Sequence, residues 1–194
     1  MKLFNILLSY FFILFLASNA QAEGGLIELD NYKFKCIRDL SGVRDFYVDN
    51  YLGKEALQKT LVIANSISGG EYPEGTVIQL VPTEIMIKRA KGTNKETNDW
   101  EFFDLNVSKN GTTVLTRGFK DVTNRFGGNC FECHSKAENK WDLICEKNHG
   151  CAPIPLTREM IKALQKTDPR CDTKVSLSDG ENEALKMLTN LIQN

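Results

Sequence analysis

The stretch Tyr72-Pro-Glu-Gly-Thr-Val-Ile-Gln-Leu-Val-Pro-Thr-Glu-Ile-Met-Ile-Lys-Arg89 carries strong strand signals. Its Pro-Glu-Gly segment is typical of a turn, and the β-branched run that follows predicts a strand over residues 76–81. Pro82 ends that run because proline lacks the backbone N–H that a sheet requires. Residues 84–89 then alternate between apolar and polar and predict a second strand. This pair of strands places an antiparallel sheet at the centre of the fold.

Further strands are expected on both sides of this pair. Residues 91–99 form a polar loop, after which residues 100–107 and 112–117 flank an Asn-Gly turn of the kind that closes hairpins. Residues 32–36 alternate in polarity and predict a short strand near the N-terminus. The middle of the chain is therefore β-rich.

Helices are expected nearer the ends of the chain. Residues 53–65 have apolar residues at helical spacing, and residues 119–126 favour a helical turn. Two more helices are predicted at residues 158–166 and 179–192. The last has a capping box of Ser178 and Glu181 and a buried stripe of Ala184, Leu185, Leu188, Leu191 and Ile192. The expected fold class is α+β, with a β-rich central antiparallel sheet and helical N- and C-terminal parts.

Residues 1–22 have the organisation of a secretory signal peptide. Lys2 precedes an apolar run of about 15 residues, and the segment ends in Ala20-Gln-Ala22, the small-x-small pattern that signal peptidase recognises. A membrane anchor is the alternative, but the run is shorter than the roughly 20 residues that span a bilayer. Cleavage before Glu23 would leave a periplasmic or secreted protein without a membrane anchor.

The composition excludes several classes of protein. The chain has 194 residues, 24 Lys and Arg against 25 Asp and Glu, and 42% hydrophobic residues. These values argue against disorder and against a polytopic membrane protein. A nucleic-acid binder would show a basic excess, so no nucleic-acid partner is expected. Residues 23–194 are predicted to form a single domain.

The chemistry is concentrated in Cys130-Phe-Glu-Cys-His134, a Cys-x-x-Cys-His motif typical of c-type haem attachment. Two thiols at this spacing can add to the two vinyl groups of one haem. The adjoining His134 is then placed under the iron as its proximal axial ligand. The motif predicts one covalently attached haem c, held by Cys130, Cys133 and His134. An exported location suits this attachment in bacteria.

Three other interpretations of Cys130 and Cys133 remain open. A thioredoxin-like redox pair would begin a helix after a strand in an α/β pattern, which this sequence lacks. A zinc site that also uses Cys145 and Cys151 has acceptable spacing but is less expected in an exported chain. A structural disulfide between Cys130 and Cys133 is the third interpretation.

The remaining cysteines, Cys36, Cys145, Cys151 and Cys171, are candidates for disulfides, which exported proteins permit. Four cysteines allow three pairings. Cys145 and Cys151 bracket a compact five-residue loop that a short bridge would close, which leaves Cys36 to pair with Cys171. This favoured pairing would tie a C-terminal extension of about residues 145–194 to the N-terminal segment.

Several motifs follow one another in a recognisable order. A helix precedes Tyr72-Pro-Glu-Gly-Thr-Val-Ile78, and then come Glu84-Ile-Met-Ile-Lys88, Asn98-Asp-Trp-Glu-Phe-Phe103 and the Cys-x-x-Cys-His motif. Over about residues 52–145 this order resembles the cytochrome P-460 and cytochrome c′-beta family. The resemblance implies an exported, β-rich, single-haem protein whose haem motif comes late in the chain.

The same resemblance bears on enzymatic activity. In that family a Lys shortly after the Gly-Thr strand start can cross-link to the haem rim and produce a hydroxylamine-oxidising site. The corresponding stretch here, Gly75-Thr-Val-Ile-Gln-Leu-Val81, contains no Lys. Lys88 on the following strand is the nearest candidate by position, but it is expected to be a solvated strand residue. Hydroxylamine oxidation therefore loses support.

The sixth iron ligand would decide what the haem does. His149 is the other His of the chain, and its place in a Cys-bounded loop favours a surface or capping role. Met86, Met160 and Met187 are candidate ligands for an electron carrier, although Met86 and Met187 have positions typical of core filling. The resemblance favours an open sixth position, where a small ligand such as nitric oxide would bind.

Polar and aromatic residues of the strands are further candidates for the lining of a haem pocket. Trp100-Glu-Phe-Phe103 is expected either to line the pocket or to fill the core. Glu84 and Asp104 would supply a proton to a bound ligand, unless they are simply solvated strand residues.

Three functions follow from these patterns. The leading one is a periplasmic mono-haem cytochrome whose partner is a small gaseous or nitrogen-containing ligand. The second is a low-spin electron-transfer cytochrome with a periplasmic redox partner, against which the absence of a clear axial Met counts. The third is a P-460-type oxidoreductase of hydroxylamine-like compounds. The sequence predicts no oligomeric state.

Overall fold

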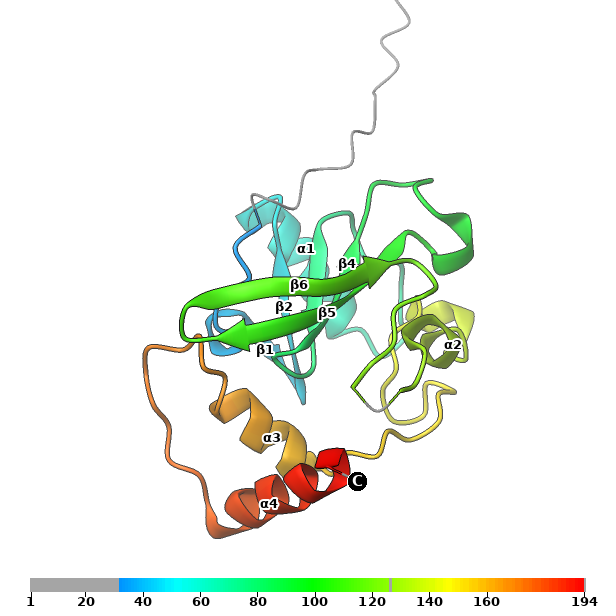
Figure 1. The fold of residues 1–194 in the computed structure, drawn as a ribbon. Coiled ribbons are helices and arrows are strands. Elements are labelled where there is room, and N and C mark those ends of the chain that lie inside the picture. The colour runs from blue at the N-terminus through cyan, green and yellow to red at the C-terminus, as the bar shows by residue number, and fades with distance from the viewer. Residues whose placement is uncertain (1–31, 126, 194) are drawn as a thin grey trace, which may run out of the picture.

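A computed structural model describes residues 32–125 and 127–193, so the expected signal peptide at 1–22 lies outside the described residues (Figure 1). Its centre is one six-stranded antiparallel sheet in which strands adjacent in sequence are adjacent in space. The strands are β1 (Ser41–Val43), β2 (Phe46–Asn50), β3 (Thr76–Gln79), β4 (Glu84–Lys88), β5 (Trp100–Ser108) and β6 (Gly111–Gly118). The expected α+β class is confirmed.

Four α-helices accompany the sheet in the described part of the chain. They are α1 (Lys54–Ala64), α2 (Cys130–His134), α3 (Arg158–Lys166) and α4 (Asp179–Gln193), and the short 3-10 turns are η2 (Ile37–Asp39), η3 (Lys95–Thr97) and η4 (Asn139–Trp141). Across the described ranges, none of the helices is long and apolar enough to cross a membrane. The helices expected at 53–65, 158–166 and 179–192 are confirmed within one residue at each end.

The capping box at the start of α4 is also confirmed. The Ser178 N–H donates to the Glu181 carboxylate at 2.7 Å, and the Glu181 N–H donates to the Ser178 hydroxyl at 3.3 Å. Ala184 and Leu188 of the expected stripe are buried and Leu185 is half-buried. The side chains of Leu191 and Ile192 lie outside the described part of the structure.

Two expectations about local structure are wrong. Residues 32–36 are not a strand, because Tyr32 and Phe34 pack across one face of the sheet instead of pairing at its edge. Residues 119–125 are not helical, since the Val122 carbonyl accepts the Cys130 N–H and holds this segment extended. Phe126, the last residue of that expected turn, is outside the described ranges. The strands β1 and β2 had not been expected.

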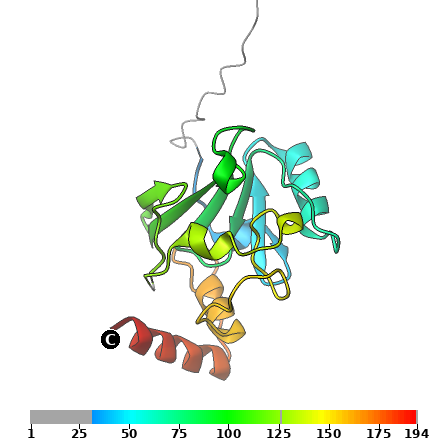
Figure 2. The same cartoon turned by 90° about the vertical axis from the view of Figure 1, so that its right-hand side faces the viewer.

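The two faces of the sheet bury different groups of residues, because successive side chains of a strand point to opposite sides. One face carries Val48, Ile78, Met86, Trp100 and Phe102, and it is covered by α1, α2 and the loop after α2. The opposite face carries Val77, Ile85, Ile87, Phe103 and Leu105, and the N-terminal segment covers it. Figure 2 shows α2 and the following loop lying over the first face, which we call the α2 face.

A buried polar chain joins α1 to the sheet. The Asn50 side-chain amide donates to the Thr60 hydroxyl at 3.1 Å, and the Thr60 and Thr76 hydroxyls lie 2.8 Å apart. All three residues are at most 4% exposed. Because buried polar groups are costly unless hydrogen-bonded, these contacts fix where α1 sits on β2 and β3.

The C-terminal helices α3 and α4 lie together at one end of the molecule (Figures 1 and 2). They share a small core of their own, made by Met160, Ala184 and Leu188. The Gln165 side chain on α3 donates to the backbone carbonyls of Asp45 and Leu80, both at 2.8 Å. The tail is thus an appendage held to the sheet by specific contacts.

Candidate haem-attachment site

The attachment motif forms the one-turn helix α2, and its start is fixed by the chain before it. The Asn129 side chain caps the helix by accepting the Glu132 N–H at 2.9 Å, and the Cys130 N–H donates to the Val122 carbonyl at 2.9 Å. Residues three apart in a helix lie on the same side, so Cys130 and Cys133 are neighbours. Both thiols are free and half-buried. The alternative of a structural disulfide between Cys130 and Cys133 is therefore not borne out.

The orientation of His134 is fixed through one of its ring nitrogens. Its Nδ1 lies 2.7 Å from the Leu143 carbonyl oxygen. A carbonyl can only accept, so Nδ1 carries the proton and Nε2 keeps its lone pair. Burial lowers the pKa of His134, and the carbonyl contact opposes that shift. A neutral imidazole with a free Nε2, oriented through the other nitrogen, is the usual state of a metal-binding histidine.

The sheet supplies an apolar wall next to this histidine. The Phe102 ring centroid lies 5.4 Å from that of His134 and 6.5 Å from that of Phe131. Met86 is buried opposite Phe102 in the β4–β5 register. Of the expected aromatic run, Trp100 and Phe102 lie on the α2 face and Phe103 lies on the other. All three are at most 2% exposed and pack in the core, and Phe102 does so next to His134.

Glu84 and Asp104 face each other across β4 and β5 at the end of the same row. They are half-buried, which corrects the expectation of solvated strand residues. Burial raises the pKa of Glu84, and the neighbouring Asp104 charge adds to the shift. Burial, together with these two carboxylates, also raises the pKa of the Cys130 thiol to about 12. A thioredoxin-like pair needs a lowered thiol pKa, so this environment counts against that interpretation.

Lys88 differs most from expectation. It is 3% exposed and is not solvated, because its ammonium lies 2.7 and 2.9 Å from the two carboxylate oxygens of Asp142. Asp142 is 3% exposed and also accepts the Tyr72 N–H at 2.9 Å. Burial raises the pKa of Asp142, and the Lys88 ammonium and the N–H donors act against that shift. The next residue is Leu143, whose carbonyl holds His134.

The other candidate iron ligands lie elsewhere in the fold. The His149 ring stacks on Trp141 at 3.8 Å, and its Nδ1 donates to the Ile144 carbonyl at 2.7 Å, in accord with the expected capping role. Met160 is buried in the small core of the tail. Met187 is 44% exposed on α4, so the expectation that it fills the core is wrong.

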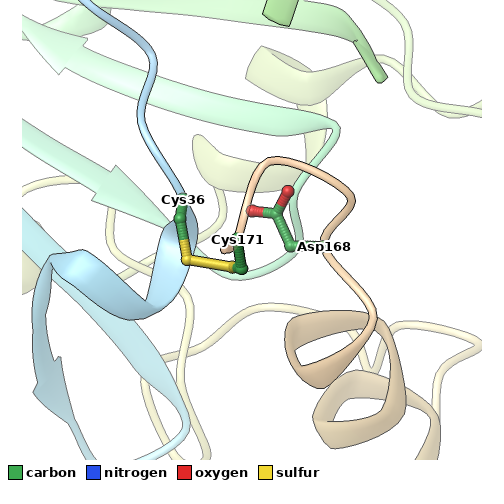
Figure 3. A group of neighbouring side chains, drawn as sticks. All are labelled: Cys36, Asp168 and Cys171. Carbon is green, nitrogen blue, oxygen red and sulfur yellow. A yellow bond between two sulfur atoms is a disulfide. The ribbon is translucent and has the colours of Figure 1, made fainter. Parts of the chain in front are cut away.

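Both favoured disulfides are confirmed: Cys36 pairs with Cys171 and Cys145 with Cys151. The second bridge removes the zinc alternative, because its two sulfurs are not available as thiolates. Figure 3 shows Asp168 close to the first bridge, which gives this group the spacing of a metal site. The same argument excludes a metal there. The Asp168 carboxylate instead accepts the Ile37 N–H at 2.8 Å and pairs with Arg170.

A separate polar cleft of about 480 Å³ lies beside the loop that follows α2. Lys91, Lys95 and Lys140 line it, together with Gly69 and Asp142. The cysteines and histidine of the attachment motif are not part of its lining.

The ligand side chains of the motif and the residues around them together fit a c-type haem. Two adjacent free thiols, a neutral imidazole fixed through Nδ1, and an apolar wall at Phe102 are the groups that such a haem needs. No protein-family model, curated protein or solved structure matches the chain. The motif itself was predictable from the sequence, whereas the link from Lys88 through Asp142 to the Leu143 carbonyl was not. Its partners are 54 residues apart and carry no local pattern.

Proposed function

We propose that the protein is an exported mono-haem c-type cytochrome, with thioether bonds at Cys130 and Cys133 and His134 as the proximal iron ligand. The observation that carries the proposal is the 2.7 Å contact between His134 Nδ1 and the Leu143 carbonyl, next to two free thiols. That contact leaves Nε2 as the nitrogen for the iron. The motif order that resembles the cytochrome P-460 and cytochrome c′-beta family supports the same conclusion.

The bound haem would supply an iron that changes oxidation state and binds small ligands. The residues of the chain have simpler tasks. The Leu143 carbonyl holds the imidazole ring and keeps its proton on Nδ1. Phe102 packs beside the imidazole ring, and Phe131 packs on Phe102. The raised pKa of Glu84 favours a protonated carboxyl near Cys130, which could donate a proton to a ligand bound nearby.

We further propose that the sixth iron position is accessible and binds a small gas such as nitric oxide. Support comes from the places of the alternative ligands. His149 is engaged with Trp141 and Ile144, and Met160 and Met187 belong to the C-terminal helices. An iron that does not have to lose a protein ligand first would bind a diatomic gas without that conformational cost.

An electron-transfer cytochrome with a redox partner is the second candidate, and Met86 favours it. Met86 is buried on the α2 face beside Phe102, which contacts His134. Of the three candidate methionines, Met86 is the one that lies on the same face of the sheet as His134. The P-460-type oxidation of hydroxylamine-like compounds has less support, because the Lys88 ammonium is already paired with Asp142.

Covalent attachment can be tested with a peroxidase stain for haem after denaturing electrophoresis. Protein made with a haem-c maturation system should keep the stain, because thioether bonds survive denaturation. Replacing Cys130 and Cys133 with Ala should remove it. The matched control replaces Cys145 and Cys151, which form a disulfide, and should keep it. Stain retained in the first variant would refute the attachment.

The iron coordination can be tested with absorption spectra of the ferrous protein. An accessible sixth position predicts a broad high-spin spectrum that shifts within seconds of adding carbon monoxide. A sharp low-spin spectrum indifferent to carbon monoxide would favour the electron carrier, and Met86→Ala and His149→Ala would then identify the ligand. His134→Ala should alter the spectrum in either case, and an unchanged spectrum would exclude His134 as the proximal ligand.

A further inference from the structure

The loop that carries the Leu143 carbonyl has an unusual backbone. Asp142 and Leu143 are consecutive residues with φ of 49° and 65°, in the left-handed region that residues other than glycine rarely adopt. Two such residues in succession are costly, and they persist only where surrounding contacts determine the conformation. Strained backbone of this kind is found at functional sites more often than elsewhere. The contacts that hold it are therefore informative.

Those contacts converge on the Asp142 carboxylate. The Lys88 ammonium reaches both of its oxygens, the Tyr72 N–H donates to one, and the Asn98 amide donates to the other at 3.3 Å. Lys88 comes from the central strand β4, and Tyr72 comes from the segment before β3. The carboxylate thus ties the strained loop to the rigid sheet.

The peptide after Asp142 links its carboxylate to the histidine. Asp142 and Leu143 share a peptide bond, and the Leu143 carbonyl accepts the Nδ1 proton of His134 at 2.7 Å. A displacement of the Asp142 side chain would therefore move the atom that orients the imidazole. The ion pair also brings one positive and one negative charge to the loop that orients His134, where they nearly cancel.

From this arrangement we infer that the Lys88–Asp142 ion pair is a positioning element for the proximal histidine, and that its balanced charges help to set the reduction potential of the iron. The inference rests on the proposed haem function. Neither Lys88 nor Asp142 is itself a ligand of the iron in this proposal. Both act through the Leu143 carbonyl and through their charge. Outer partners of metal-binding histidines commonly tune the metal in this way.

The test is a mediated redox titration of the haem-loaded protein at pH 8, in which dithionite supplies the electron that converts ferric to ferrous iron. Asp142→Asn leaves an uncompensated ammonium, which favours the less positive ferrous state and should raise the potential. Lys88→Met leaves an uncompensated carboxylate and should lower it. We expect each single variant to change the equilibrium constant for reduction at least threefold, in opposite directions, and the double variant, in which the charges balance again, to lie between them.

A matched ion pair on the opposite face of the same strands provides the control. Arg89 and Glu101 are 3% and 4% exposed and form a buried pair, to which Arg117 adds a second contact with Glu101, and they face away from α2. Glu101→Gln should destabilise the fold without shifting the potential. Shifts of the same sign in the two single variants at the Lys88–Asp142 pair, or a shift in Glu101→Gln as large as that in Asp142→Asn, would overturn the inference.

The haem stain separates this result from the proposed function itself. If the stain is absent from the wild-type protein, the haem proposal has failed. If every variant keeps covalent haem and the potential of Asp142→Asn equals that of the wild type, the inference about the Lys88–Asp142 pair has failed and the haem proposal stands.

Discussion

The two disulfides offer a direct test of how the C-terminal tail contributes to stability. Cys36–Cys171 joins residues 135 apart in sequence, whereas Cys145–Cys151 joins residues six apart. In the chain-entropy model, a cross-link destabilises the unfolded state more when it closes a longer loop. The perturbation is the replacement of each pair by Ala, which avoids placing a hydroxyl at the buried position 36.

The expected magnitudes follow from the loop lengths. Loss of loop-closure entropy amounts to about 5 kcal/mol for the Cys36–Cys171 bridge and about 2 kcal/mol for the Cys145–Cys151 bridge. Since whole domains are stable by about 5–15 kcal/mol, the longer bridge accounts for a large part of the total. Contacts in the native tail, such as Asp168 with the Ile37 N–H, remain in both variants.

The assay is urea unfolding of the protein, followed by far-ultraviolet circular dichroism. With a slope of about 2 kcal/mol per molar urea, the midpoint should fall by about 2.5 M without the longer bridge and by about 1 M without the shorter one. Equal slopes in the variants would show that the folded states are comparable. If removal of Cys145–Cys151 costs as much as removal of Cys36–Cys171, the loop-entropy reasoning is refuted.

Three further predictions concern single residues. Burial raises the pKa of Glu84, so the folded state favours the protonated carboxyl. This contribution to stability is present below the usual glutamate pKa range and is lost as pH rises. Glu84→Gln should therefore raise the urea midpoint at pH 8 and leave it unchanged at pH 4. Gly69→Ala should cost more than about 3 kcal/mol of unfolding free energy, because its Cβ would lie 2.1 Å from the Lys140 carbonyl oxygen. Gly92→Ala, also at positive φ but with no atom within 4 Å, should cost only about 1 kcal/mol. The pKa of Asp168 is lowered: burial acts to raise it, but hydrogen bonds from Arg170 and from the Ile37 N–H outweigh that effect. Asp168→Asn should therefore destabilise the protein at neutral pH, and the difference from the wild type should vanish in strong acid.

The strands from β3 to β6 were predictable because their sequence signals are local. A β-branched run, an alternating run and an Asn-Gly turn each act over a few residues, and the structure places strands at all of them. The same holds for the helices, where the spacing of apolar residues and one capping box suffice. Meander topology helps, since each strand pairs with its neighbour in sequence.

The strands β1 and β2 were missed because their sequences carry mixed signals. Ser41–Val43 has three residues and includes a glycine, and Phe46–Asn50 ends in Asp and Asn, which are uncommon in strands. Pairing with β3 overrides these weak propensities. Residues 32–36 show the opposite error. Their alternation reflects Tyr32 and Phe34 lying on the sheet, a tertiary contact that imitates the pattern of a strand.

The candidate site divides in the same way. The motif at residues 130–134 shows in the sequence which side chains are the candidate ligands. Their protonation and orientation depend on residues far away in the sequence. In the sequence Lys88 has the pattern of a surface charge, but in the structure it pairs with Asp142 from the loop after α2. The pKa of Glu84 is raised by burial and by the neighbouring Asp104, neither of which the local sequence shows. These partners come from three separate segments that the sheet brings to one face.

That face has an ordering that bears on function. Along β4 it reads Lys88, Met86 and Glu84, and each residue has its partner in β5 or above it. A charge-balanced pair lies at one end, a half-buried acid at the other, and an apolar surface lies between them beside His134. An iron bound there would have its proximal ligand fixed from the Lys88 end and a proton donor near the Glu84 end. A substitution at the Lys88 end is therefore expected to change the reduction potential and leave proton delivery intact. A substitution at the Glu84 end is expected to change proton delivery.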